Sequence, residues 1–184
     1  MSREIRAVYG ADTVTVYQAY KAEIALPAVA AGRFTAAFSR ERMTWIKPSF
    51  LWMMYRCGWA TKEGQEHVLA VEIRRDGLEW ALARACLSHY DPDVHESAAA
   101  WKRQLQQSPV RVQWDPERDL QLRPVPGVRS LQLGLSGEAV RRYADEWTVS
   151  ITDVTDRAQQ IHALVQAHDL DAARALLPPE RPLT

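Results

Sequence analysis

Alternation of apolar and polar positions along the chain predicts several β-strands. Residues 13–20 (TVTVYQAY) are mostly β-branched or aromatic, and a strand there places Val14, Val16 and Gln18 on one face and Tyr17 on the other. We expect this strand to be central in its sheet. Further strands are expected over 67–74, 110–114, 120–123, 130–135 and 147–152.

Apolar residues at helical spacing, bounded by start and stop signals, predict helices between these strands. Pro48 fits the first turn of a helix over 48–57, and Gly58 fits its end. Asp76 and Asp93 each open a pattern typical of a capping box. The helices are expected over 24–31, 48–57, 76–87, 93–107, 136–146 and from 153 or 155 onwards.

The order of these elements predicts an α+β fold. The strands cluster in the second half of the chain, which favours a mixed or antiparallel, split sheet with flanking helices over a strictly parallel one. The chain has 184 residues, with no internal repeat and no long linker. We therefore expect one domain over 1–177, followed by a flexible tail over 178–184.

Charge narrows the range of partners. The formal net charge is zero, which argues against a protein that coats nucleic acid or a membrane through a global basic field. Residues 1–60 nevertheless carry eight Lys or Arg against four acidic residues, so local basic patches are expected. Nucleotide or nucleic-acid binding at a local site therefore stays open.

Several classes of chemistry find no support in the sequence. Cys57 and Cys86 belong to no paired motif, and the five histidines have no metal-ligand spacing, so we expect no metal site. The start MSREIRAVYG lacks the apolar run of a signal peptide, and no stretch reaches the roughly 18 apolar residues of a membrane span. A cytoplasmic protein without membrane contact is expected.

Residues 42–56 (RMTWIKPSFLWMMYR) interleave cations with large aromatic side chains. A base can stack on Trp or Tyr, for about 1–3 kcal/mol, while Arg or Lys neutralises a phosphate. The free N–H groups at the start of a helix over 48–57, beside Lys47 and Ser49, would also suit an anion. Alternatively, the Trp and Met side chains fill the core and the cations only mark the helix ends.

Residues 113–119 (QWDPERD) end a predicted strand in a run of polar side chains, with a turn expected over 115–118. A carboxylate such as Glu117 could accept hydrogen bonds from a ribose hydroxyl there and stabilise a developing cationic sugar. The alternative is a solvated turn in which Glu117 and Arg118 form a surface pair worth under about 1 kcal/mol.

Other polar positions could face the same space. Gln18, on the face of Val14 and Val16, needs a partner when buried, which is either a ligand or a neighbouring backbone group. Arg129 and Gln132 face the side of Gln113 if their two strands pair.

Five stretches carry a resemblance to one family: VYQAY, RMTWIKPSFLWMMYRCGW, QWDPERD, RSLQLGL and ITDVT. They resemble a family described as a domain of unknown function, number 4291, found in bacteria and some eukaryotes. The resemblance covers roughly residues 6–161, and the stretch over 42–56 is long enough to be specific. It brings little function with it.

The chain is also similar to the ADP-ribosyltransferase fold, which binds NAD in a cleft between two small sheets. The resemblance puts Tyr17 and Gln18 at the first-strand position, 44–49 at the second motif and 115–117 at the late acidic motif. It implies that Glu117 is catalytic, orienting the nicotinamide ribose and stabilising an oxocarbenium-like transition state. The implied NAD-binding residues are Tyr17, Gln18, Arg42, Thr44, Trp45, Lys47, Ser49, Gln113, Trp114 and Asp115.

These observations leave more than one function open. The first is an enzyme that transfers ADP-ribose from NAD to nucleic acid or a small molecule, with Trp45 or Tyr17 stacked on the nicotinamide and Arg42 and Lys47 on the phosphates. The second is a non-catalytic module that binds single-stranded nucleic acid or nucleotides. A third is a partner-binding protein that uses exposed Trp and Met side chains.

Overall fold

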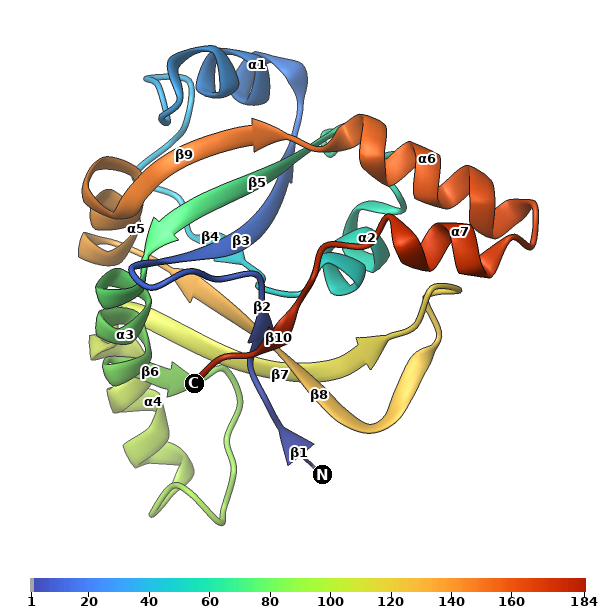
Figure 1. Cartoon of the computed structure of the whole chain (residues 1–184). Coiled ribbons are helices and arrows are strands. Elements are labelled where there is room, and N and C mark those ends of the chain that lie inside the picture. The colour runs from blue at the N-terminus through green and yellow to red at the C-terminus, as the bar shows by residue number, and fades with distance from the viewer. Residues whose placement is uncertain (1) are drawn as a thin grey trace.

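Two β-sheets share one apolar core in the computed structural model, which describes residues 2–184 (Figure 1). The core draws Val16 and Val71 from the first sheet and Val110 and Leu133 from the second. Helices flank both sheets, so the predicted α+β class with mixed and antiparallel sheets is confirmed.

The elements have the following bounds. The strands are β1 (Ser2–Arg3), β2 (Arg6–Ala7), β3 (Thr13–Tyr20), β4 (Thr44–Ile46), β5 (His67–Arg74), β6 (Ala85–Leu87), β7 (Val110–Arg118), β8 (Pro124–Leu135), β9 (Thr148–Asp153) and β10 (Arg181–Pro182). The helices are α1 (Ala22–Ala31), α2 (Phe50–Cys57), α3 (Arg75–Ala83), α4 (Ala98–Gln107), α5 (Glu138–Arg142), the π-helical turn η1 (Tyr143–Trp147), α6 (Thr155–Gln166) and α7 (Leu170–Ala175).

β5 is the central strand of the three-stranded sheet, with β3 and β9 antiparallel on either side. The expectation that the strand over 13–20 is central is therefore wrong. β5 buries the consecutive residues Val68 and Leu69, one on each face, as a strand covered on both faces requires. The other edge of β3 forms an isolated bridge between Tyr17 and Lys47, which ties it to the segment after β4.

The second sheet has the order β1-β8-β7-β6, and β4 also pairs with β8. β7 and β8 form the expected hairpin, but the predicted turn over 115–118 and strand over 120–123 are wrong. The turn lies over 119–123, closed by a backbone hydrogen bond of 3.0 Å between its end residues. β6 pairs only with residues 110–112 of β7, so the side of β7 that faces away from β8 is unpaired farther along, at Pro116. Proline is tolerated at such an edge.

Helix starts differ more from prediction than helix ends. α4 is capped by Ser97, whose hydroxyl accepts a backbone N–H at 3.1 Å, rather than by Asp93. Asp76 lies inside the first turn of α3 instead of at its cap. The stops at Gly32 and Gly58 are confirmed, with left-handed φ values of 64° and 58°.

Two predicted helices are shorter than expected. The helix over 76–87 ends at Ala83, because residues 85–87 leave it to pair with β7 as β6. The helix over 136–146 divides into α5 and η1, and its cap is Gly137 rather than Ser136.

Residues 178–184, for which the sequence predicts a flexible tail, lie along the N-terminal segment. β10 pairs antiparallel with β2, and the Leu183 N–H donates to the Ile5 carbonyl at 2.8 Å. A carboxylate oxygen of Glu180 accepts the Phe50 N–H at 2.7 Å, so the end of the chain contacts the start of α2.

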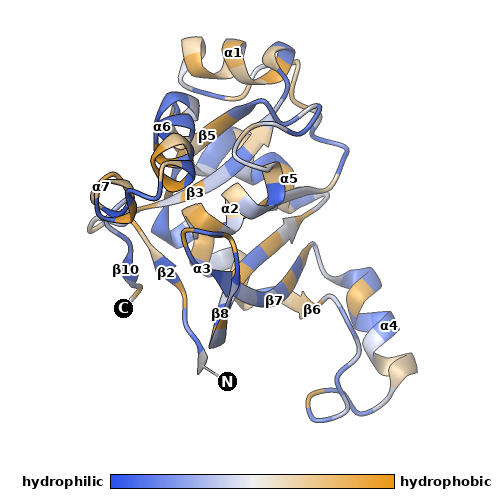
Figure 2. Cartoon of the chain, turned by 90° about the vertical axis from the view of Figure 1, so that its right-hand side faces the viewer, coloured by the Kyte–Doolittle hydropathy of each residue, from blue (hydrophilic) through white to orange (hydrophobic). Residues whose placement is uncertain are grey.

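α2 lies in the gap between the three-stranded sheet and the β7–β8 hairpin (Figure 1). Its inner side joins a second apolar cluster with α6 and α7, which contains Met54, Cys57, Ala158 and Ile161. α4 stands off on the far side of β6, away from this gap (Figure 2). None of the helices within residues 2–184 is long and apolar enough to cross a membrane.

Candidate functional site

The pairing of β4 with β8 brings the two segments singled out by sequence onto one sheet face. Trp45 is the register partner of Gly134, which is also paired with Arg111 of β7. Gln113 pairs with Gln132 and therefore shares its face, as predicted, whereas Arg129 pairs with Pro116 and does not line the hollow described below. The same face carries Trp45 and, beyond the end of β4, reaches Lys47.

Three polar side chains on this face are held in a fixed arrangement. The carboxylate of Asp115 accepts a hydrogen bond from the Gln113 amide at 2.9 Å and another from the Gln132 amide at 2.8 Å. The two donors bind different oxygens of Asp115, so both oxygens are engaged. A single acid thereby fixes the orientation of two amides that border the hollow described next.

α2 forms the wall that faces this sheet. Trp52 and Tyr55 stack with ring centroids 5.0 Å apart, and the Arg118 guanidinium lies 3.6 Å from the centroid of the Tyr55 ring. Residues 52, 55 and 56 follow the i, i+3, i+4 spacing of one helix face. Wall and sheet face enclose a hollow of about 450 Å³, lined by Trp45, Lys47, Trp52, Tyr55, Arg56, Gln113, Asp115, Arg118 and Gln132.

Two further hollows continue this one along β4. A hollow of about 230 Å³ shares Trp45, Lys47 and Arg56 with the first. It also shares Tyr20 and Thr44 with a third hollow of about 580 Å³. We call the three together the β4 groove; it runs from the loop after α1 to the hollow under α2.

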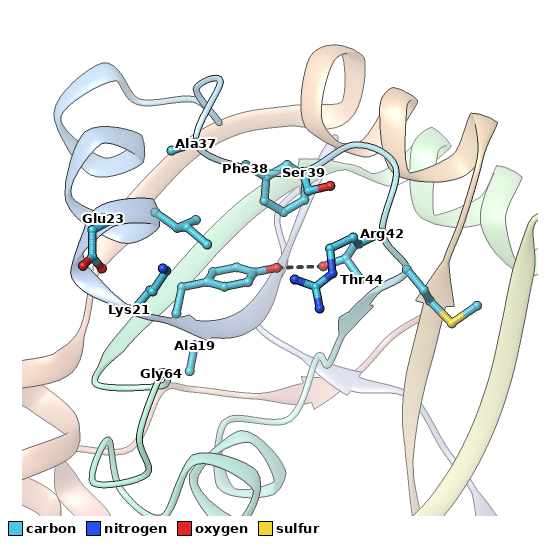
Figure 3. Close-up of a pocket in the computed structure, with 12 residues that line it drawn as sticks. Ala19, Lys21, Glu23, Ala37, Phe38, Ser39, Arg42, Thr44 and Gly64 are labelled. Carbon is cyan, nitrogen blue, oxygen red and sulfur yellow. Dashed lines mark hydrogen bonds between the residues drawn. The ribbon is translucent and has the colours of Figure 1, made fainter.

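The third hollow forms the wide end of the β4 groove (Figure 3). Lys21 and Glu23 border it on one side, and Arg42 reaches in from the other. At its floor the Tyr20 and Thr44 hydroxyls are hydrogen bonded at 2.7 Å. Burial raises the pKa of Tyr20 to about 12, so this phenol stays protonated at neutral pH.

Gln18 is buried behind this floor and is fully engaged by protein groups. Its amide nitrogen donates to Thr44 at 2.6 Å and to the Trp45 carbonyl at 3.2 Å, and its oxygen accepts from Tyr143 at 2.6 Å. Of the two partners considered from sequence, the structure supplies neighbouring protein groups. Gln18 thus supports the groove from behind and also lines its middle hollow.

Lys47 is the most unusual side chain of the groove. It is 5% exposed and lines two of the three hollows, yet within residues 2–184 its ammonium has no hydrogen-bond or ion-pair partner. Burial, aided by the nearby Arg56, lowers its pKa to about 8. A buried cation without a counter-ion is unfavourable for folding, which is typical of a functional position.

Not every sequence candidate reaches the groove. Tyr17 points to the other side of β3, where it meets Phe50 edge-on at 5.5 Å. Trp114 packs against the shared core. The Ser49 hydroxyl donates to the Glu117 carboxylate at 2.8 Å, and neither residue is among those that line the groove.

The start of α2, considered from sequence as an anion site, is occupied by the chain itself. The Ser49 hydroxyl accepts the Trp52 N–H at 3.1 Å, and Glu180 accepts the Phe50 N–H. Desolvation, together with the neighbouring Glu117, raises the pKa of Glu180 to about 8. A carboxyl group of the protein itself therefore fills the place expected for a ligand phosphate.

The structure also brings in residues that the sequence reasoning did not select. Trp52, Tyr55, Arg56 and Arg118 line the α2 end of the groove. The first three lay within the segment singled out by sequence, and the helical spacing of 52, 55 and 56 could have identified them. The sequence predicts a turn at Arg118, because Pro116 hides the continuation of β7.

Comparison with known proteins identifies a family for the chain but no curated relative. Within residues 2–184 no group of three or more His, Cys, Asp or Glu side chains lies together as a metal site would require. No curated protein matches the chain significantly. A family model described as "Domain of unknown function (DUF4291)" matches residues 4–183, so the chain belongs to this family.

Proposed function

We propose that the β4 groove binds a nucleotide, NAD in the first instance, and that the protein transfers ADP-ribose from it. One observation carries the proposal: strands far apart in the sequence contribute Trp45, Lys47, Gln113 and Asp115 to the same hollow. A stacking surface, a cation, amides and an acid are what recognition of a base, a phosphate and a ribose requires.

The groups of the groove match the parts of such a ligand. The Trp45 ring rests on the backbone of Gly134 and borders two of the hollows, so it offers a stacking surface worth about 1–3 kcal/mol per base. Gln113 and Gln132 offer amides whose orientation Asp115 fixes. Lys47 and Arg42 supply cations at two different hollows along the groove.

Two acids compete for the role of stabilising the developing oxocarbenium ion. Glu117 is the one that the ADP-ribosyltransferase resemblance implies, and it is hydrogen bonded to Ser49 beside the groove. Asp115 lies in the groove itself. A fixed carboxylate next to a cationic sugar stabilises the transition state by several kcal/mol in a dry site.

The experiment uses labelled NAD with the wild type and the two neutral variants Asp115→Asn and Glu117→Gln. Single-stranded RNA, single-stranded DNA and a pool of small molecules serve as acceptors. We expect label transfer by the wild type and a loss of about 10²–10³-fold in the variant that removes the acting acid. If the wild type neither binds NAD nor transfers label to any acceptor, the proposal is wrong.

A second candidate is the binding of single-stranded nucleic acid without catalysis. It is favoured by the length of the groove, which carries cations at both ends: Lys21 and Arg42 at one, Arg56 and Arg118 at the other. Such binding weakens steeply with salt. Oligonucleotide binding that competes with NAD and falls with salt would favour it, whereas salt-independent or absent binding would remove it.

A further inference from the structure

The hollow under α2 contains three nitrogen donors that have no partner within residues 2–184. Trp52 Nε1 and Arg118 Nε are buried and make no hydrogen bond. Lys47, described above, adds its ammonium. Buried donors in folded proteins are nearly always paired, so these two orphaned donors, beside an ammonium that borders the hollow, indicate that an acceptor-rich group belongs there.

Charge at this hollow favours an anion. Its lining contains three cations, Lys47, Arg56 and Arg118, against the single carboxylate of Asp115. Both Asp115 oxygens already accept hydrogen bonds from glutamine amides, so this acid is satisfied without the cations. With three cations against one acid, the lining keeps an excess of positive charge.

The other conventional anion position nearby is closed. At the start of α2 the Phe50 N–H donates to Glu180 and the Trp52 N–H donates to Ser49, as described above. An anionic ligand on this side of the molecule thus meets the side-chain donors under α2 rather than the helix terminus. The hollow under α2 is therefore a different anion site from the helix N-terminus that the sequence suggested.

We infer that the hollow under α2 is a phosphate subsite, in which Lys47, Arg118 and Trp52 donate to a phosphate or pyrophosphate group. This inference rests on the proposed nucleotide groove and deepens it, because it fixes the direction of the ligand. The phosphates lie under α2, and the nucleoside extends past Trp45 towards Tyr20 and Arg42. A phosphate has several acceptor oxygens in different directions, which suits donors that come from the segment after β4, from α2 and from β7.

The test is calorimetric titration at one low salt concentration with pyrophosphate, ADP-ribose, adenosine and citrate as probes. The proteins are the wild type, Lys47→Met, Arg118→Met and the matched control Lys102→Met on α4, an exposed lysine remote from the groove. Circular dichroism establishes that each variant is folded. We expect pyrophosphate and ADP-ribose to bind the wild type and Lys102→Met equally, and at least tenfold more weakly to Lys47→Met and Arg118→Met.

The outcomes separate the subsite from the proposed function. If ADP-ribose binds but neither substitution weakens it, the phosphate subsite is overturned while the nucleotide groove stands. If pyrophosphate binds through Lys47 but no nucleotide competes for it, the subsite stands and nucleotide binding fails. If citrate binds more tightly than pyrophosphate, the hollow prefers carboxylate groups, and its assignment as a phosphate subsite is overturned.

Discussion

The Trp45 ring lies directly on the backbone of Gly134, its partner in the β4–β8 ladder. A Cβ placed at residue 134 would come 2.9 Å from the ring carbons, closer than real Cβ atoms approach a neighbour. Only glycine at this position leaves room for the indole where it lies, at the border of the groove. The stacking surface of the proposed site thus depends on a residue that has no side chain.

Gly134→Ala should therefore displace Trp45 and destabilise the fold by about 1–3 kcal/mol, the usual effect of overpacking. Urea denaturation gives the stability, and tryptophan fluorescence reports the moved ring. The matched control is Gly10→Ala, where an added Cβ meets its nearest atom at an ordinary 3.6 Å. Equal stability of the two variants would show that the ring does not rest on residue 134.

Lys47→Met should stabilise the protein at neutral pH while abolishing phosphate binding. The pKa of Lys47 is lowered from 10.5 to about 8 by burial, Arg56 adds to the lowering, and Cys57 and Asp115 oppose it. The unfolded chain therefore binds more protons between these two values. Burial of the Lys47 ammonium therefore destabilises the folded protein by about 3 kcal/mol below pH 8, and this penalty decreases as the pH rises from about 8 to 10.5.

The measurement for Lys47 is the free energy of unfolding of both proteins at pH 7 and pH 9.5. The difference between them should shrink at the higher pH, because Lys47 is then largely neutral in the folded wild type. Thiols and phenols titrate in both proteins, so their contribution to the free energy of unfolding cancels in this difference. A Lys47→Met protein less stable than the wild type at pH 7 would show that the ammonium has a partner.

Ser49→Ala should destabilise the protein by about 1–2 kcal/mol, because it removes the cap of α2 and the donor to Glu117. Glu117→Gln retains an oxygen that can accept from both Ser49 and the Arg118 N–H, so we expect it to fold with nearly wild-type stability. Thermal denaturation of the two variants tests this. A large loss of stability in Glu117→Gln would assign that acid a structural role.

Glu180 should make the docking of residues 178–184 depend on pH. Its pKa is raised from 4.5 to about 8 by desolvation and by Glu117, so the folded state binds the extra proton between these values. The stability it contributes is present below pH 4.5 and is lost as the pH rises through about 8. The protection factor of the Phe50 amide, which corrects for the intrinsic base catalysis of exchange, should fall across this range in the wild type and stay constant in Glu180→Gln.

Local patterns made much of this fold predictable. The strand over 67–74, the hairpin of β7 and β8 and the glycine stops of α1 and α2 follow from alternation and turn chemistry. Predictions fail where strand pairing overrides local signals. Pro116 predicts a turn but lies in an edge strand, and residues 85–87 continue a helical pattern but pair with β7 as β6.

The candidate site was predictable in part. Arg42, Thr44, Trp45, Lys47, Gln113 and Asp115 do line the groove, because their segments were correctly expected to meet. Which face each side chain takes depends on register and bulges, and at the irregularity between Pro116 and Arg118 it is Arg118, not Glu117, that lines the groove. The burial of Lys47 without a partner is a tertiary property that no local pattern signals.

The central claim is that Trp45 and its neighbours bind a nucleotide in the β4 groove. Calorimetric titration of NAD into the wild type, Trp45→Ala and the control Trp101→Ala on α4 tests it most directly. We expect binding by the wild type and the control, and a loss of about tenfold in Trp45→Ala, as removal of one stacking surface implies. Absence of NAD binding by the wild type, or equal affinity in Trp45→Ala, would contradict it.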